Sequence, residues 1–383
     1  MVDRIKIGIV GIGQRGLQHL GTLLWIEHAE VVALCDPFPE NLEEEKIRRY
    51  IPDFEVGSIK RYTVFDEMLR ESHLDAVYFC VPPGLHDGEL LRAAERGIHI
   101  FAEKPMSLFL DEALAMERAI REAGVIAAVG FQLRYDSRYT AIKEFLRDKR
   151  MVMITVIGNG ALEGHSVKHT KTEILGGPPN RVWTANFAWS GSTVVEAGIH
   201  PLDLMRYWVG DVVWTQASYV HRDPQDIVDG GDNPYAYAVT FGFTCGMVGN
   251  LLTTKLRRTF YGDSYQHIVW DHGYLKVEAD GPVAYYYTGP YPPPGPVDPA
   301  SLRHPLTVPP PSDTTLAINE AFVNAVATQD EGLLRSRFSD GMNSLTAVLA
   351  ANASDQLNGE RISLREFLEG ERYAAFRRKP SKR

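Results

Sequence analysis

The sequence predicts two domains: an α/β domain built on a doubly wound parallel sheet, then an α+β domain with a mostly antiparallel, open-faced sheet. The first third of the chain alternates apolar runs with helical patterns, as successive βαβ units do. Beyond it, strand-like runs follow one another, several with no helix between them. The length of 383 residues also exceeds one ordinary domain. We place the domains at 1–134 and 135–383, with the final helices able to pack back on the first domain.

Strands and helices alternate through the first domain. Continuous apolar runs predict strands buried on both faces of the sheet: 5–10, 31–35, 75–81, 98–102 and 125–129. Helical periodicity predicts the segments between them: 17–26, 40–49, 65–71, 85–96 and 110–123. Gly97 and Gly124 directly follow two of these helices, where a left-handed residue commonly ends a helix.

The pattern changes after about residue 135. A helix is predicted over 137–148, followed by strand-like runs: 151–158, 212–221, 235–243, 246–256, 265–271 and 273–278. The third and fourth of these runs form a hairpin. Residues 281–312 are rich in proline and tyrosine and have no periodicity, which predicts a long extended surface loop. Helices at 314–328 and 338–356 follow, and Phe367 and Tyr373 anchor a final helix.

Composition excludes several classes of protein. Forty basic and forty-nine acidic residues give a net charge of −9, which argues against a broad nucleic-acid or anionic-membrane surface. No apolar run approaches the roughly 20 residues that span a bilayer, and the first strand leaves no room for a signal peptide. Cys35, Cys80 and Cys245 lack C-x-x-C spacing, so we expect buried structural thiols in a reducing cytoplasm and no metal site.

The first strand ends in G-x-G-x-x-G, and a helical pattern follows directly. The turn consists of Gly11, Ile12, Gly13, Gln14, Arg15 and Gly16. Gly11 permits the tight turn, Gly13 lets the backbone approach a pyrophosphate, and Gly16 lets helix and strand pack closely. Amide groups at the helix N-terminus then face the phosphates. The turn predicts a Rossmann dinucleotide site; an ordinary βαβ turn is the alternative.

Asp36 follows the second strand, twenty residues after Gly16. A carboxylate there meets the ribose hydroxyls of an adenine dinucleotide and repels a 2′-phosphate. The next residues, 37–40, carry no basic side chain. We therefore predict NAD in preference to NADP.

Polar side chains also follow two later strands. Pro82 and His86 lie in the loop after one of them, and Glu103-Lys104-Pro105 follows the next. Ligands of open parallel sheets bind outside the carboxyl ends of the strands, so Lys104 is placed where a nicotinamide and its substrate meet. A solvent-facing lysine at a strand end is the alternative.

The stretch 191–208 carries a second candidate group. Helical spacing puts Glu196, His200 and Asp203 on one face, at i, i+4 and i+7. A neighbouring carboxylate fixes the tautomer of a histidine and stabilises its protonated form, as a proton acceptor requires. One more surface histidine among the twelve is the alternative.

These motifs together resemble the Gfo/Idh/MocA family of nicotinamide-dependent oxidoreductases, which includes glucose–fructose oxidoreductase and inositol dehydrogenase. The resemblance implies that Lys104 and His200 are the catalytic lysine and histidine. Glu196 stands where the family usually has aspartate, which leaves its role open. The resemblance also places Glu103 near the nicotinamide ribose and implies a cis peptide before Pro105.

The resemblance places further residues at the border of the substrate site: Arg134, Tyr135, His165, Lys168, His169, Arg181, Trp183 and Asp203. Such a mixture of aromatic and hydrogen-bonding groups suits a sugar or cyclitol, although each residue alone has an equally good structural role. Relatives form dimers through the exposed face of the second sheet, and tetramers are frequent, so we expect a homodimer or homotetramer.

The implied reaction is hydride transfer between NAD and a sugar, inositol or related polyol. His200, shared with Lys104, takes the hydroxyl proton, and Lys104 stabilises the developing oxyanion. Two other functions stay open. One is an NAD-dependent glycosidase that works by transient oxidation and elimination. The other is a non-catalytic dinucleotide-sensing regulator, against which the presence of both residues argues.

Overall fold

The apolar runs of the first domain form a sheet in which all neighbouring strands are parallel. The computed structural model describes residues 4–161, 183–227, 230–256 and 262–379. The strand order is β3-β2-β1-β4-β5-β6. The bounds are Ile5–Val10 (β1), Ala29–Cys35 (β2), Lys60–Tyr62 (β3), Ala76–Phe79 (β4), His99–Ala102 (β5) and Ala127–Val129 (β6). The predicted doubly wound parallel sheet is confirmed; β3 was missed because its first two residues are basic and exposed.

The helices of this domain match the periodicity in position but are mostly shorter. They are Gln14–Leu23 (α1), Glu44–Arg48 (α2), Phe65–Glu71 (α3), Glu89–Ala94 (α4) and Leu110–Ala123 (α5). The single helix predicted over 40–49 is wrong, because Glu43 is extended and separates a 3-10 turn from α2. The helix predicted from residue 85 starts only after Gly88, whose φ is 92°. α5 has its predicted bounds and ends at left-handed Gly124.

The second sheet is mostly antiparallel, as predicted, and only β7 and β10 pair in parallel. Its order among the described residues is β14-β13-β12-β11-β7-β10-β9-β8-β15. The bounds are Met151–Ala161 (β7), Val212–Val220 (β8), Ala236–Phe243 (β9), Val248–Leu256 (β10), Asp263–Trp270 (β11), Gly273–Glu278 (β12), Gly281–Tyr286 (β13), Arg303–Pro305 (β14) and Ile362–Ser363 (β15). β9 and β10 form the predicted hairpin.

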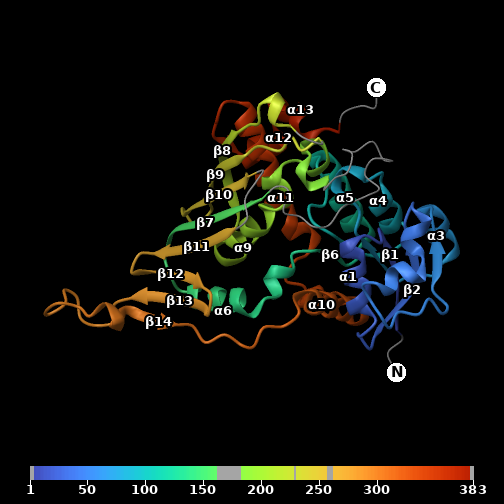
Figure 1. Ribbon diagram of the computed structural model, residues 1–383, viewed down its shortest axis with the longest axis horizontal. Coiled ribbons are helices and arrows are strands. Elements are labelled where there is room, and N and C mark those ends of the chain that lie inside the picture. Colours follow the sequence, from blue (N-terminus) through green and yellow to red (C-terminus); the bar gives the residue numbers. More distant parts are fainter. Residues whose placement is uncertain (1–3, 162–182, 228–229, 257–261, 380–383) are drawn as a thin grey trace.

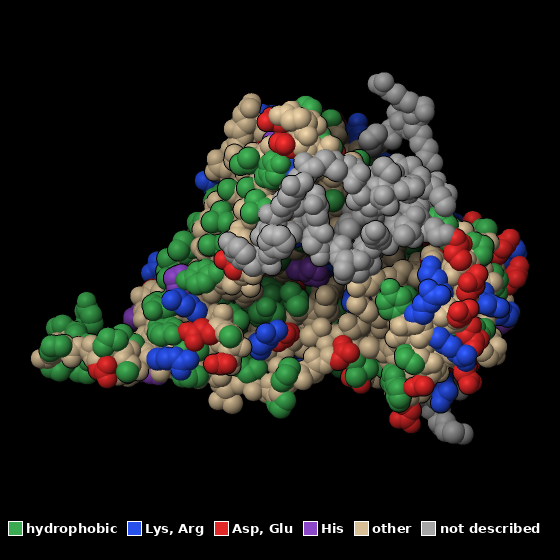
Figure 2. All heavy atoms as spheres, in the orientation of Figure 1, with side chains coloured by type: hydrophobic (Ala, Val, Ile, Leu, Met, Phe, Trp, Pro, Cys, Tyr) green, Lys and Arg blue, Asp and Glu red, His purple; other side chains and the backbone are tan. Residues whose placement is uncertain are grey.

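The loop predicted over 281–312 is wrong in part, because its two ends form β13 and β14 and extend the sheet. Tyrosines account for the difference. Tyr285 stacks on Tyr274 of β12 at 4.9 Å between ring centroids, and Tyr286 packs on Trp270 of β11. The segment between β13 and β14 projects from the body of the molecule (Figure 1), and apolar side chains gather on it (Figure 2).

The remaining helices connect the two sheets. They are Ser137–Leu146 (α6), Phe187–Ser190 (α7), Thr193–Glu196 (α8), Ile199–Val209 (α9), Thr314–Thr328 (α10), Phe338–Gln356 (α11), Leu364–Glu369 (α12) and Ala374–Arg377 (α13). α10 packs on α1 of the first domain, and α11 packs on both α5 and β8 (Figure 1). Both α10 and α11 thus contact helices of the first third of the chain, and the domain division at 1–134 and 135–383 stays a prediction. Phe367 and Tyr373 are buried, but they lie in separate elements, because Gly370 divides α12 from the 3-10 turn that ends at Tyr373.

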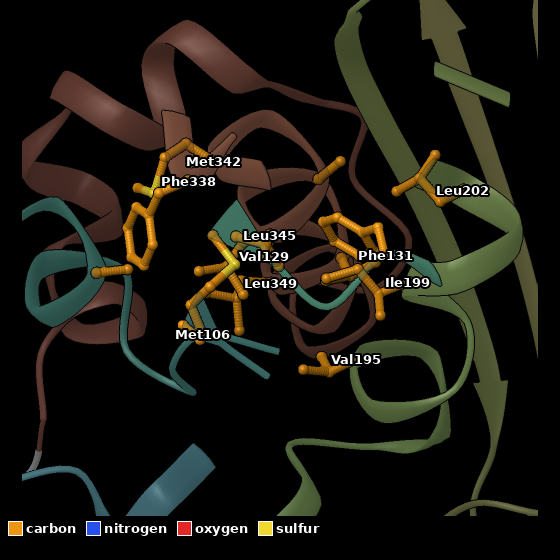
Figure 3. Close-up of a cluster of buried hydrophobic side chains, with 14 of the residues drawn as sticks. Met106, Val129, Phe131, Val195, Ile199, Leu202, Phe338, Met342, Leu345 and Leu349 are labelled. Atoms are coloured by element: carbon orange, nitrogen blue, oxygen red, sulfur yellow. The ribbon is translucent and has the colours of Figure 1, made fainter. Parts of the chain in front are cut away.

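One apolar core is shared by the two domains. Figure 3 shows Val129 and Phe131, at the end of β6, packed with Ile199 of α9 and Leu345 of α11. All four side chains are at most 1% exposed. A core packed at this density leaves little room for one domain to slide past the other. The helix that carries His200 is therefore held in one position relative to β5, which precedes Lys104.

Candidate functional site

The glycine turn leaves open space at one of its three glycines. A Cβ on Gly11, whose φ is 87°, would lie 2.6 Å from the Cys80 carbonyl oxygen, and a Cβ on Gly16 would lie 1.9 Å from the Gly11 oxygen. A Cβ on Gly13 would meet nothing within 4 Å. Gly13 also begins α1 without any side-chain cap. The turn therefore fits a pyrophosphate, since the helix N-terminus opens onto space that a side chain at position 13 would fill.

Asp36 fastens this turn to the end of β2. One carboxylate oxygen accepts a hydrogen bond from the Ile12 amide at 2.8 Å. The other accepts from the Phe38 amide at 3.0 Å and from Asn41 Nδ2 at 2.9 Å. A carboxylate has about four acceptor positions, so one remains for a ribose hydroxyl. Ordering the glycine turn is a role of Asp36 that the sequence did not reveal.

Arg15 points to the end of β5. Its guanidinium donates to Glu103 Oε1 at 2.8 Å, and His19 Nε2 lies 3.0 Å from the same oxygen. Burial opposes ionisation of Glu103, but Arg15 and then His19 outweigh it and hold the pKa of the carboxyl well below its usual range. Of the residues expected at the cofactor, Arg15 and Glu103 thus bind each other, while Gln14 is exposed beside them.

The loop after β4 turns its histidine inward. Residues Pro83–Leu85 form a 3-10 turn, and Pro82 precedes it half-buried. His86 is 3% exposed, and its Nδ1 is hydrogen-bonded to Glu89 Oε1 of α4. The backbone of this loop remains at the carboxyl end of the sheet, but the His86 side chain, expected at the cofactor, is directed into α4.

Lys104 and Glu196 form an ion pair between the two domains. Lys104 Nζ donates to Glu196 Oε1 at 2.9 Å and to the Glu196 carbonyl oxygen at 2.9 Å. The side chains are 13% and 20% exposed. The peptide before Pro105 is cis, as the resemblance implied. This pair joins the end of β5 to the end of α8.

The continuous helix expected around His200 is wrong. α8 ends at Glu196 and α9 starts at Ile199, and a Cβ on Gly198 between them would lie 2.7 Å from the Val194 oxygen. The break turns Glu196 to Lys104 instead of to the imidazole. Nδ1 of His200 has no hydrogen-bond partner among the described residues. Burial, and then the Lys104 ammonium, lower the pKa of His200 to about 3.

Asp203, expected beside His200 or the substrate, lies in a buried pair with Arg134. Nε and Nη2 of Arg134 donate to the two Asp203 oxygens, each at 2.7 Å. Ser344 of α11 donates to the same carboxylate at 2.9 Å. The hydroxyl of Tyr135 accepts from the Arg335 amide at 2.9 Å. These expected substrate ligands therefore have polar atoms directed to other protein groups.

The other expected substrate residues are less informative. Trp183 begins a 3-10 turn, Trp183–Ala185, and is half-buried. Lys168 lies outside the described residues, as do His165, His169 and Arg181. Cys35 is buried and Cys80 is half-buried, whereas Cys245 is exposed in the β9–β10 turn and is not the buried thiol we expected.

Lys255, near the end of β10, was missed. The alternation of β10 places it on the face of Leu251, which packs against the junction of α8 and α9. Burial lowers the pKa of Lys255, and the charge of Glu196 partly offsets that effect. The alternation of side chains along β10 is visible in the sequence. It indicates where Lys255 points only once the structure shows which face of the strand is turned inward.

Among the described residues, no helix combines the length and apolar character that crossing a membrane would need. No three His, Cys, Asp or Glu side chains in these ranges come together as a metal-binding group.

The similarity of this chain to known proteins is concentrated in its first domain. The Gfo/Idh/MocA model, described as an oxidoreductase family with an NAD-binding Rossmann fold, matches residues 5–131. Myo-inositol 2-dehydrogenase of Thermotoga maritima is 27% identical over 264 residues, which cover 67% of this chain and 70% of that protein. The scyllo-inositol 2-dehydrogenase (NAD(+)) of Bacillus subtilis is 29% identical over 212 residues, or 55% of each chain. The chain thus spans little more than half the length of some of these curated relatives.

A solved structure extends the likeness to both domains. Scyllo-inositol dehydrogenase from Lactobacillus casei, with bound NAD(H) and scyllo-inositol, superposes with a TM-score of 0.69 at 19% identity. The superposition covers 95% of this chain and all of that one. At this identity the likeness establishes the fold.

Proposed function

We propose that this chain, whose residues 5–131 match the Gfo/Idh/MocA oxidoreductase model, is an NAD-dependent dehydrogenase that oxidises a CH–OH group of a sugar, inositol or related polyol. The observation that carries the proposal is the Lys104–Glu196 pair, whose charges act on His200, where the carboxyl end of β5 meets α8 and α9. These groups come from two domains, as expected of a site between a cofactor domain and a substrate domain.

The reaction releases a hydride and a proton from the CH–OH group, so the site needs an acceptor for each. Bound NAD⁺ supplies the hydride acceptor. The low pKa keeps the His200 imidazole neutral above about pH 3, so one ring nitrogen has a lone pair that can accept the hydroxyl proton. The Lys104 ammonium stabilises negative charge on the substrate oxygen as that proton leaves. Glu196 holds Lys104 in place through two hydrogen bonds.

The glycine turn predicts how the cofactor site responds to one added methyl group. Gly13→Ala should weaken NAD binding about 10- to 100-fold, because the methyl group occupies the space that the pyrophosphate needs. Stability should stay within about 0.5 kcal/mol, because a Cβ there meets nothing within 4 Å. Calorimetric titration with NAD and thermal unfolding test both statements. Gly21→Ala, in the same helix and in ordinary contact with Ile51, is the matched control and should bind NAD normally. Equal affinities of the two variants would contradict the cofactor placement.

The proposed function itself is tested with a substrate panel. Aldoses, inositols, sugar acids and glycosides are each mixed with NAD or NADP, and absorbance at the NADH wavelength is followed together with product analysis. We expect NADH and an oxidised product from at least one polyol, with NAD preferred because Asp36 disfavours a 2′-phosphate. Release of sugar from a glycoside with no net NADH would indicate the glycosidase instead. NAD binding without turnover of any compound, and unchanged cellular function after replacement of Lys104 and His200, would favour the regulator.

The open face of the second sheet supports a proposed homodimer or homotetramer. Met153 of β7, Val220 of β8, Leu252 of β10 and Tyr265 of β11 are exposed on the face opposite α9 and α11. Apolar groups gathered on one sheet face favour contact with a second surface. Light scattering should give a mass of two or four chains, and Leu252→Glu should lower it. A monomeric wild-type protein would contradict this assembly.

A further inference from the structure

The inward face of β10 brings a second ammonium towards the proposed active site. Leu251 Cδ2 would lie 2.8 Å from a Cβ on Gly198, so this face of the strand rests on the α8–α9 junction. Lys255 has the same orientation four residues later, about 13 Å along the strand. Its Nζ lies 4.0 Å from the Cβ position of Gly160, its partner on β7. The side chain therefore reaches across to β7, and the charge of Glu196 acts on its ammonium.

The end of β10 is held in a fixed position by Arg222. This buried guanidinium donates to the carbonyl oxygen of Lys255 at 2.8 Å and to that of Asn233 at 2.6 Å. It also lies 3.8 Å from the ring centroid of Tyr235. The Lys255 amide donates to the Tyr235 carbonyl oxygen at 2.8 Å. Lys255 thus extends from an ordered strand end rather than from a loose loop.

The charged groups named so far around the proposed active site leave one positive charge in excess. Lys104 and Lys255 each carry one positive charge, Glu196 carries one negative charge, and His200 is neutral. Glu103 does not alter the sum, because Arg15 is paired with it. Within the described ranges no carboxylate lies at ion-pair distance from Lys255 Nζ. A partly desolvated ammonium in this setting gains from an anion that arrives with the substrate.

We propose that Lys255 binds a carboxylate of the substrate, so that the enzyme acts on sugar acids in preference to neutral sugars. The inference rests on the proposed function and narrows its substrate class. Lys104 and His200 act on the hydroxyl that is oxidised, while Lys255 fixes the acidic group at the other end of the molecule. Arg222 is a positioning residue, because it acts through the backbone of Lys255.

Binding measurements test the proposal independently of turnover. Calorimetry on the NADH-loaded protein compares D-gluconate and D-glucuronate with the neutral D-glucitol and D-glucose. We expect the acids to bind at least tenfold more tightly, and their affinity to fall as salt is raised. Lys255→Met should weaken acid binding about 10- to 100-fold, while Lys255→Arg should retain it within about threefold. Lys276→Met, which removes a strand lysine on the opposite face, should change nothing.

The outcomes separate this inference from the proposed function. Neutral polyols that bind as tightly as their acids, or acid affinity unchanged in Lys255→Met, would overturn the role of Lys255, even where NADH is formed. Acid binding that depends on Lys255 without any NADH would support the anion site and overturn the dehydrogenase. If Lys255→Met fails to fold, Lys255→Gln and the salt dependence of the wild-type protein decide the question.

Discussion

Lys104→Met is expected to lower kcat by about two to four orders of magnitude, because it removes the charge that we propose stabilises the substrate oxygen. NAD affinity should change less than threefold, since the proposed pyrophosphate contacts lie at the glycine turn. The fold should survive, because Glu196 is 20% exposed and water can reach its carboxylate. Rates measured with the best substrate of the panel, together with calorimetric NAD titration, test this expectation.

The same variant has a second readout that does not depend on turnover. Lys104 is, after burial, the largest cause of the low pKa of His200. Removing the ammonium should therefore raise the pKa of His200 towards its ordinary value, although burial keeps it below 6.5. NMR titration of the imidazole measures this shift. Lys60→Met, an exposed lysine on the edge strand β3, is the control. A kcat within threefold of wild type and an unmoved His200 pKa would remove Lys104 from the site.

Local sequence signals predicted the positions of the strands and helices well. An apolar run predicted β4, and helical periodicity ended by a glycine predicted α5. These signals lie in or next to the elements themselves. The hairpin β9–β10 and the long helices α10 and α11 are equally local. The errors arose where tertiary packing outweighs periodicity: Glu43 interrupts a helical pattern, and tyrosines turn the ends of a proline-rich stretch into β13 and β14. The fold class was predictable for this reason, and the exact pairing of distant strands was not.

The candidate site shows the same contrast between features set by neighbouring residues and features set by distant contacts. The turn that contains Gly11, Gly13 and Gly16 could be predicted, because all of its residues are consecutive in the sequence. The hydrogen-bond and ion-pair partners of the site residues could not be predicted, because they depend on contacts between segments that are distant in the sequence. Glu196 and His200 share a helical spacing in the sequence, yet Gly198 breaks the helix and sends Glu196 to Lys104, 92 residues away. Lys255 was missed for a related reason, since no motif links β10 to α8.

Arg134→Met is expected to destabilise the protein by about 3–5 kcal/mol, because it leaves the carboxylate of Asp203 buried without its bidentate partner. The side chains of the pair are 7% and 2% exposed. Ser344 and Arg206, whose Nη1 lies 3.6 Å from Asp203, remain and keep the loss from exceeding that range. Denaturant unfolding measures the change. At temperatures where the variant stays folded, KM should change less than threefold, since Arg134 contacts Asp203 and not the substrate.

Two comparisons separate this structural role from substrate binding. Arg138→Met removes an arginine from the nearby Asp136 pair, in which Arg138 is 47% exposed, and should cost at most about 1 kcal/mol. The double variant Arg134→Met with Asp203→Leu replaces both buried charges by apolar groups and should recover much of the lost stability. A substrate ligand would behave in the opposite way: KM would rise steeply at unchanged stability, and the second substitution would restore nothing. That result would return Arg134 to the substrate site where the sequence first placed it.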